Sequence, residues 1–165
     1  MAAAVTLDEL LAWCDEAAAN WRSHFDSNPS QLDLPCDIGG AANVQAFVRH
    51  VWGVELRWAQ RIAGLPITDR DATPTGPLEA LYALHTEASA ILHGALGNAG
   101  FDWNGVISLE FPWLGPGSHD FTRRKLAAHA LLHSQRHYAQ LATLLRQAGH
   151  PATVRGDLLL SSALR

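Results

Sequence analysis

Four stretches of the chain repeat their apolar residues at alternating steps of three and four, a spacing that places one apolar stripe along an α-helix. The stretches span about 6–28, 43–64, 77–98 and 122–147. Four such helices, with one longer connection before the last, are typical of a helical bundle. We therefore predict an all-α fold, a four-helix bundle with a short irregular hairpin between the third and fourth helices, as a single domain over residues 1–165.

Capping residues mark where these helices should begin. Thr6, followed three residues later by Glu9, forms a capping box before the first helix. Asn43 has the short polar side chain preferred at the start of the second helix. Either Asp120 or Thr122 could begin the fourth helix in the same way. Capping side chains thus mark the starts of three helices, and Pro77 suits the first turn of the third.

The segment 98–117 breaks the helical pattern. Residues 103–106 read Trp-Asn-Gly-Val, a tight-turn signal, and a glycine–proline–glycine break follows at 115–117. Between them we predict a strand with one apolar face, which would need a partner surface. Closed two-fold dimers commonly cover such faces, so we expect a homodimer; the alternative is a lid over the open end of the bundle. The face consists of Ile107, Leu109, Phe111 and Trp113.

Charge and composition exclude several partners. The net charge is −4, and the only basic run, 123–125, reads as the solvated start of a helix, whereas duplex-binding domains concentrate positive charge on one face. No apolar run approaches the roughly 18–20 residues of a membrane span. The first basic residue is Arg22, so the charged region of a signal peptide is not expected. We predict a cytoplasmic protein with no nucleic-acid or membrane partner.

Nine histidines in 165 residues are the unusual feature. His133 and His137 are one helical turn apart, so both rings can reach one ion. At about 100° per residue, they fall in the middle of the predicted apolar face of the fourth helix. Burying imidazoles without partners costs roughly 1–3 kcal/mol each, so they either form hydrogen bonds in the core or bind a metal. The predicted face consists of Leu126, Ala130, His133, His137, Gln140 and Leu144.

The second helix offers two further candidates. His50 lies at the edge of its apolar stripe, where a histidine could be a ligand or a structural residue. Glu55 lies within the stripe, and its carboxylate could orient a ligand or act as a base. Among the other histidines, His129 is either a fourth ligand or, as we favour, a residue that packs beside the site. His24 and His85 lie near the edges of their stripes, where they could line a pocket, and we favour partial exposure. The stripe consists of Val44, Val48, Val51, Glu55, Trp58 and Ile62.

Two segments carry a resemblance to a known family. Residues 50–64 (HVWGVELRWAQRIAG) and 129–141 (HALLHSQRHYAQL) resemble the second and fourth helices of the DinB-like, damage-inducible metalloprotein superfamily. The resemblance implies a four-helix bundle with a divalent metal bound by His50, His133 and His137. The family motif in the fourth helix usually ends in His-Arg-Gly-Gln; this chain has Tyr-Ala in place of Arg-Gly.

The resemblance also suggests a function, because characterised enzymes of the family include thiol-dependent transferases and isomerases. Three imidazoles leave an open metal position, as in catalytic sites. We therefore predict a metal-dependent thiol transferase or hydrolase acting on a small molecule, with a low-molecular-weight thiol as a candidate partner. Glu55 or Gln140 would orient the nucleophile.

The metal and the alternative function remain open at this point. Imidazole binds several first-row metals, so we expect one divalent ion, zinc or nickel first and iron or manganese as alternatives. The alternative function is a non-catalytic metal-binding or stress-response protein. A pocket that reaches an exchangeable metal position would favour the enzyme, and a closed site would favour the binder.

Overall fold

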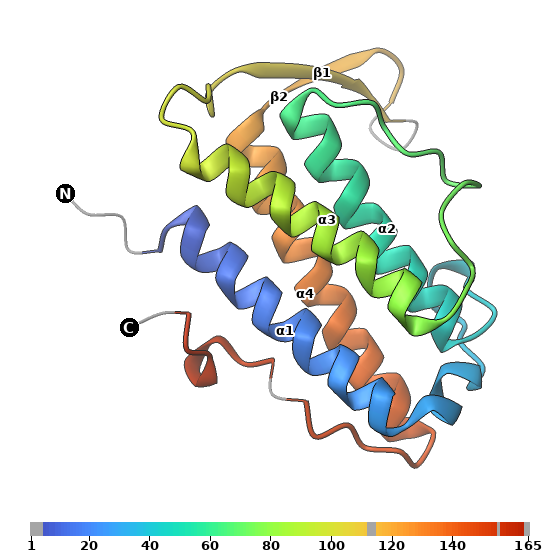
Figure 1. Cartoon of the computed structure of the whole chain (residues 1–165). Helices are drawn as coiled ribbons and strands as arrows, with labels where there is room; N and C mark the ends of the chain where they lie inside the picture. Colours follow the sequence, from blue (N-terminus) through green and yellow to red (C-terminus); the bar gives the residue numbers. More distant parts are fainter. Residues whose placement is uncertain (1–4, 112–114, 155, 164–165) are drawn as a thin grey trace.

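The computed structural model describes residues 5–111, 115–154 and 156–163, and it confirms the predicted bundle. Four long helices lie side by side, with α1 and α3 in front of α2 and α4 in the view of Figure 1, and a two-stranded hairpin crosses one end. The elements in chain order are α1 (Leu7–Ser27), η1 (Pro29–Asp33), η2 (Ile38–Gly40), α2 (Val44–Ala63), α3 (Leu78–Gly97), β1 (Val106–Glu110), β2 (Ser118–Thr122), α4 (Arg123–Gln147) and η4 (Leu158–Leu160).

The predicted helix starts are confirmed by their hydrogen bonds. Thr6 and Glu9 form the capping box of α1. The Oδ1 atom of Asn43 accepts a hydrogen bond from a backbone N–H in the first turn of α2, at 2.9 Å. At α4, Thr122 and not Asp120 is the cap, and its hydroxyl accepts from the N–H of Lys125 at 3.2 Å. Local signals therefore fix where the bundle helices begin.

The buried face of α4 is rotated from the predicted one, so that prediction was wrong in detail. Gln140 is exposed, and Leu144 and His133 are only half-buried. Half of the predicted face is buried as expected, and a neighbouring row that includes Leu131, Tyr138 and Leu141 faces the core beside it, because burying these residues removes more apolar surface from water. The buried residues of α4 are Leu126, Ala127, Ala130, Leu131, Ser134, His137, Tyr138, Leu141 and Leu145.

The predicted hairpin between the third and fourth helices is present, but its details differ from the prediction. Its first strand, β1, lies where the alternating pattern placed it, but β2 was not predicted, and the glycine–proline–glycine segment 115–117 lies between the strands and not after them. The two strands pair antiparallel. A short strand with few β-branched residues gives little signal of its own and forms through its partner. Ile107, Leu109 and Phe121 pack against the bundle core; Trp113 lies outside the described residues.

None of the helices in the described part of the chain combines the length and the apolar character that a membrane span requires.

Candidate metal centre

Two helices bring three histidines to one point. His50 comes from the first half of α2, and His133 and His137 come from the middle of α4, which packs against α2. One ring nitrogen from each residue lies within 4.8 Å of the other two. The Nε2 atoms of His133 and His137 are 3.0 Å apart. The structure thus places together all three residues that the sequence singled out as ligands.

The spacing of these nitrogens suits a metal ion. Imidazole nitrogens bind zinc at about 2.0–2.1 Å in tetrahedral geometry, so two of them on one ion lie about 3.3–3.4 Å apart. The 3.0 Å separation in α4 is a few tenths of an ångström shorter. The ring of His50 lies 5.3 Å from that of His137, at an angle of 86°. The donor set therefore fits a borderline metal such as zinc, nickel or iron.

Hydrogen bonding selects the nitrogen that faces the cluster. Nδ1 of His137 donates a hydrogen bond to Oε1 of Gln140 at 2.6 Å. This bond fixes the proton on Nδ1, so Nε2 of the same ring directs its lone pair toward the cluster. The Nδ1 atom of His133 is buried and has no hydrogen-bond partner among the described residues. Phe47 packs edge-on against His137, with ring centroids 5.2 Å apart. Gln140 therefore contacts the ring of His137, whereas the role predicted for it was to orient the nucleophile, which this contact does not test.

The electrostatic environment keeps these imidazoles neutral. Burial first, then the charges of His137 and Arg57, lower the pKa of His50 to about 4. Burial first, then His137, lowers the pKa of His133 to about 3. The pKa of His137 is also lowered, chiefly by burial. All three are neutral near pH 7, and this is the form that binds metals.

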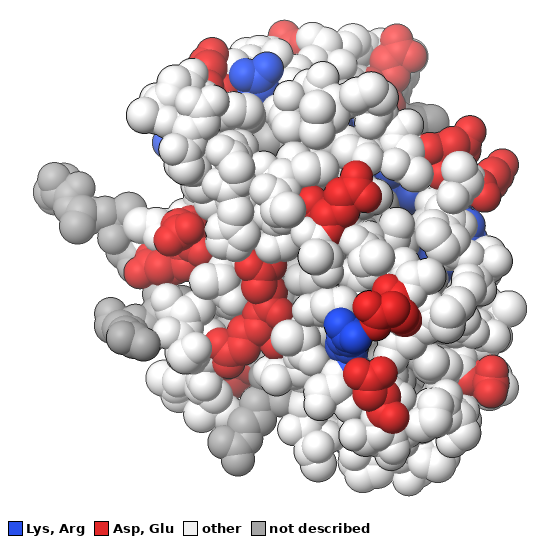
Figure 2. Space-filling model, in the orientation of Figure 1, with Lys and Arg blue, Asp and Glu red and all other residues white. Residues whose placement is uncertain are grey.

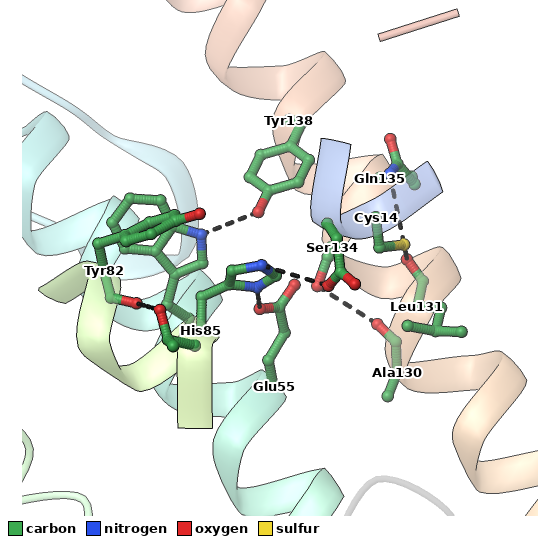
Figure 3. A network of polar contacts seen from close by, with 12 residues as sticks. Cys14, Glu55, Tyr82, His85, Ala130, Leu131, Ser134, Gln135 and Tyr138 are labelled. Atoms are coloured by element: carbon green, nitrogen blue, oxygen red, sulfur yellow. Dashed lines mark hydrogen bonds and ion pairs between the residues drawn. The ribbon is translucent and has the colours of Figure 1, made fainter. Parts of the chain in front are cut away.

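Glu55 lies outside this cluster. Its Oε2 accepts a hydrogen bond from Nδ1 of His85 at 2.8 Å, and both residues are buried, at 6% and 3% exposure (Figure 3). Nε2 of His85 lies 3.4 Å from Oδ1 of Asp15. Burial lowers the pKa of His85, but the hydrogen bond and the charge of Glu55, together with Asp15, raise it overall. The three residues join α1, α2 and α3.

The expectation that His85 is partly exposed was wrong. The row Leu81, His85, Ala88 and Leu92 is buried along α3, so helical spacing alone could have placed His85 on the inner face. Its partner could not be found that way, because the carboxylate comes from a helix 30 residues earlier. The predicted orienting role of Glu55 at the metal has no contact that supports it.

Further buried groups fill the space between the helices. The indole Nε1 of Trp52 donates to the hydroxyl of Tyr138 at 2.8 Å and so joins α2 to α4. Cys14 contacts Gln135 and the carbonyl of Leu131, and burial raises the pKa of its thiol to about 12. Tyr138, which stands where the family motif has arginine, is therefore a core residue, and Cys14 is an unreactive one.

Two neighbours of the cluster complete the site. His129 is exposed and packs on Trp58, and its ring centroid is 5.9 Å from that of His133; it is not one of the grouped ligands. On the other side, a cavity of about 160 Å³ is bounded by His50, by the loop 38–42 and by arginine side chains. A small solute in this cavity would contact the ring of His50.

A four-helix bundle that gathers three neutral imidazoles from two helices, beside a cavity, is the arrangement of helical-bundle proteins that can hold a metal ion through histidines. The model of the DinB superfamily matches residues 2–141, which include all three histidines, and the chain belongs to that superfamily. A search of curated proteins found no match.

Replacing Gln140 by alanine should weaken metal binding by about 10- to 100-fold, the usual effect of losing a group that orients a metal ligand. The side chain of Gln140 is exposed and contacts Nδ1 of His137, so its loss frees the ring without disturbing the core. Competition with a chelator of known affinity measures the change. Gln147→Ala, two turns later on the same helix, is the control and should bind metal as the unmodified protein does. Equal affinities for all three proteins would contradict the orienting role.

Proposed function

We propose that the protein is a metal-dependent enzyme, a thiol transferase or hydrolase, that holds one divalent transition metal through His50, His133 and His137. The observation that carries the proposal is the convergence of three imidazole nitrogens within 4.8 Å of one another, at the edge of a cavity. Structural zinc sites close their fourth position with a further protein ligand, whereas catalytic sites leave it to water or substrate. Among the described residues, the histidine cluster offers three ligands, as a catalytic site does.

When bound, a divalent ion supplies Lewis acidity and lowers the pKa of a water or thiol in its open position. The contribution of the chain is to keep three imidazoles neutral and oriented. Gln140 fixes the tautomer of His137, and Phe47 packs against that ring and excludes water from one side. Zinc and nickel are the metals that we favour, with iron or manganese as alternatives.

The cavity beside His50 favours the enzyme over a non-catalytic metal-binding or stress-response protein. A metal that only stabilises or stores has no need of a solute-sized space beside a ligand, whereas a substrate does. We propose a low-molecular-weight thiol as the nucleophile and a cytoplasmic location, where such thiols are abundant. We also propose the homodimer expected from the sequence. Ile107 and Leu109 pack on the bundle core, so their apolar face is already partly covered within one chain. Light scattering measures the mass of the protein in solution and so its oligomeric state.

The test combines metal analysis with an activity screen. Protein purified without a histidine tag should contain about one divalent ion per chain. The loaded protein is then assayed with a panel of small thiols and electrophilic acceptors, and with simple esters and amides for hydrolysis. Activity that chelation removes and the same metal restores supports the enzyme. One bound ion without metal-dependent turnover across the panel would favour the non-catalytic binder.

Removing the metal should leave the protein folded, because the core does not depend on the site. The buried apolar residues of all four helices form one continuous cluster, which joins the helices through contacts of their own. Chelator-treated protein should therefore keep its far-UV circular dichroism at room temperature and lose only the stabilisation that follows from ligand binding. Unfolding on chelation would make the metal structural and would count against catalysis.

A further inference from the structure

Three arginines converge on the cavity beside His50. The chain has a net charge of −4, and Asp and Glu side chains dominate over Lys and Arg on the face formed by α1 and α3 (Figure 2). The cavity next to the metal centre has the opposite character. Its lining includes Arg49, Arg57 and Arg70 together with His50, and no carboxylate residue is among the lining residues described.

Arg49 has a structural role. Its Nη2 donates to the carbonyl of Thr73 at 2.7 Å and its Nε donates to the carbonyl of Pro74 at 3.0 Å. A further bond at 3.1 Å reaches the carbonyl of Arg70. Arg49 therefore holds the segment 70–74 against α2, and in doing so it fixes the backbone that carries Arg70.

No carboxylate among the described residues pairs with Arg57 or Arg70. Arg57 is half-buried, and its one hydrogen bond within the described residues is a long one, 3.4 Å, from Nη1 to the hydroxyl of Thr73. In the part of the chain that the structure describes, neither arginine forms an ion pair. Burial first, then the like charges of Arg70 and Arg49, lower the pKa of Arg57. An unpaired, partly buried cation destabilises a fold unless something compensates it.

The backbone makes room for this guanidinium. Gly53 lies one turn before Arg57 on α2, and a Cβ atom at that position would be 3.3 Å from Nη1 of Arg57 and 3.2 Å from Cγ2 of Thr73. Side chains on a helix lean toward its N-terminus. The absence of a side chain at Gly53 thus lets the head of Arg57 lie back along the helix, in the direction of His50.

His50 and Arg57 are seven residues apart and so lie on one face of α2, about 10 Å apart along its axis. Both line the same cavity, with Arg70 facing them from the loop. A molecule in the cavity can therefore contact a guanidinium at one end and reach the metal centre at the other. Guanidinium groups bind oxyanions through paired, charge-assisted hydrogen bonds.

We propose that this cavity is an oxyanion subsite, in which Arg57 and Arg70 bind the carboxylate, phosphate or sulfonate group of a small molecule whose reacting group lies at His50, His133 and His137. The second half of the inference rests on the proposed function, and it narrows the substrate class to anionic small molecules. The first half, an anion site made by Arg57 and Arg70, does not depend on the metal.

In the first experiment, calorimetry measures the affinity of the metal-free protein for inorganic phosphate. Methanesulfonate and acetate are further probes. Arg57→Gln and Arg70→Gln should each weaken phosphate binding about tenfold or more, since each removes hydrogen bonds to a charged group. Arg61→Gln is the matched control: Arg61 lies one turn after Arg57 on α2 but stacks on Trp58 outside the cavity lining. The affinity of Arg61→Gln for phosphate should equal that of the unmodified protein. Arg70 is exposed, so Arg70→Gln keeps the test decisive if Arg57→Gln folds poorly.

The second experiment links the subsite to the metal. Zinc-loaded protein is titrated with 3-mercaptopropionate, which carries a thiol and a carboxylate, and with 2-mercaptoethanol, which carries a thiol and no anion. Arg57→Gln should weaken binding of the first about tenfold and leave the second unchanged. Equal losses for both thiols, or phosphate affinities that are the same in all four proteins, would overturn the subsite. A protein that binds phosphate through Arg57 but takes up no metal would overturn the proposed function and leave the anion site standing.

Discussion

Replacing His133 by alanine should abolish tight metal binding and leave the bundle folded. The residue supplies one of three nitrogens in the cluster, and its Nε2 lies 3.0 Å from that of His137. Losing a group that merely orients a ligand costs about 10- to 100-fold in metal affinity, so losing a ligand should cost more than about 100-fold. His133 is half-buried at the margin of the core, and the variant should therefore fold. Metal content after dialysis, with circular dichroism in parallel, measures both.

The matched control is His129→Ala, one turn earlier on the same helix. His129 packs on Trp58 and its ring approaches that of His133, yet it is not one of the grouped ligands. This variant should keep about one ion per chain. Full metal retention by both His133→Ala and His137→Ala would remove the metal centre, whereas loss in His129→Ala alone would mean that the ligand set is wrong.

Local chemistry explains what could be predicted from the sequence. A capping residue such as Thr6 or Asn43 forms its hydrogen bond within the first turn, so the signal and the structure are a few residues apart. The pairing of His133 with His137 is local for the same reason. The third ligand is different: helical spacing placed His50 at the edge of a stripe, and it was the resemblance that joined it to the α4 pair.

Contacts between distant segments explain what could not be predicted from the sequence. Two adjacent rows run along α4, and the row through Ser134 and Tyr138 faces the core, where Tyr138 bonds to Trp52 of α2. Likewise, β2 forms through β1, and the cationic cavity needs the loop residue Arg70 to fold back on α2. In each case the determining contact joins segments that are distant in sequence, where periodicity carries no information.

Replacing His85 by leucine should destabilise the protein by about 3–5 kcal/mol, the range seen when one partner of a buried ion pair is removed. The loss leaves the carboxylate of Glu55 in the core without its 2.8 Å hydrogen bond. The Oε1 atom of Glu55 already has no hydrogen-bond partner among the described residues, so little compensation is at hand. Chemical denaturation monitored by tryptophan fluorescence gives the free energy of unfolding.

The double variant Glu55→Leu with His85→Leu separates an ion pair from simple packing. If each single change costs stability because it strands the other partner, the double variant should recover most of the loss, since apolar residues of similar volume often replace a buried pair at little cost. Additive losses would show that the two side chains contribute independently. Leu84→Ala, also buried on α3, is the control for general loss of packing and should be additive with Glu55→Leu.

The same variants give a pH signature and decide the role of Glu55. Because Glu55 and Asp15 raise the pKa of His85 in the folded state, protonated His85 stabilises the fold fully below its unfolded pKa of about 6.5, and this contribution is lost as the pH rises through the higher folded value. The stability gap between the unmodified protein and His85→Leu should therefore narrow above about pH 6.5. Glu55→Leu should still bind metal, because its carboxylate contacts His85 and not the histidine cluster. If the gap is flat with pH and Glu55→Leu loses its metal, the carboxylate belongs to the metal centre, as the sequence pattern first indicated.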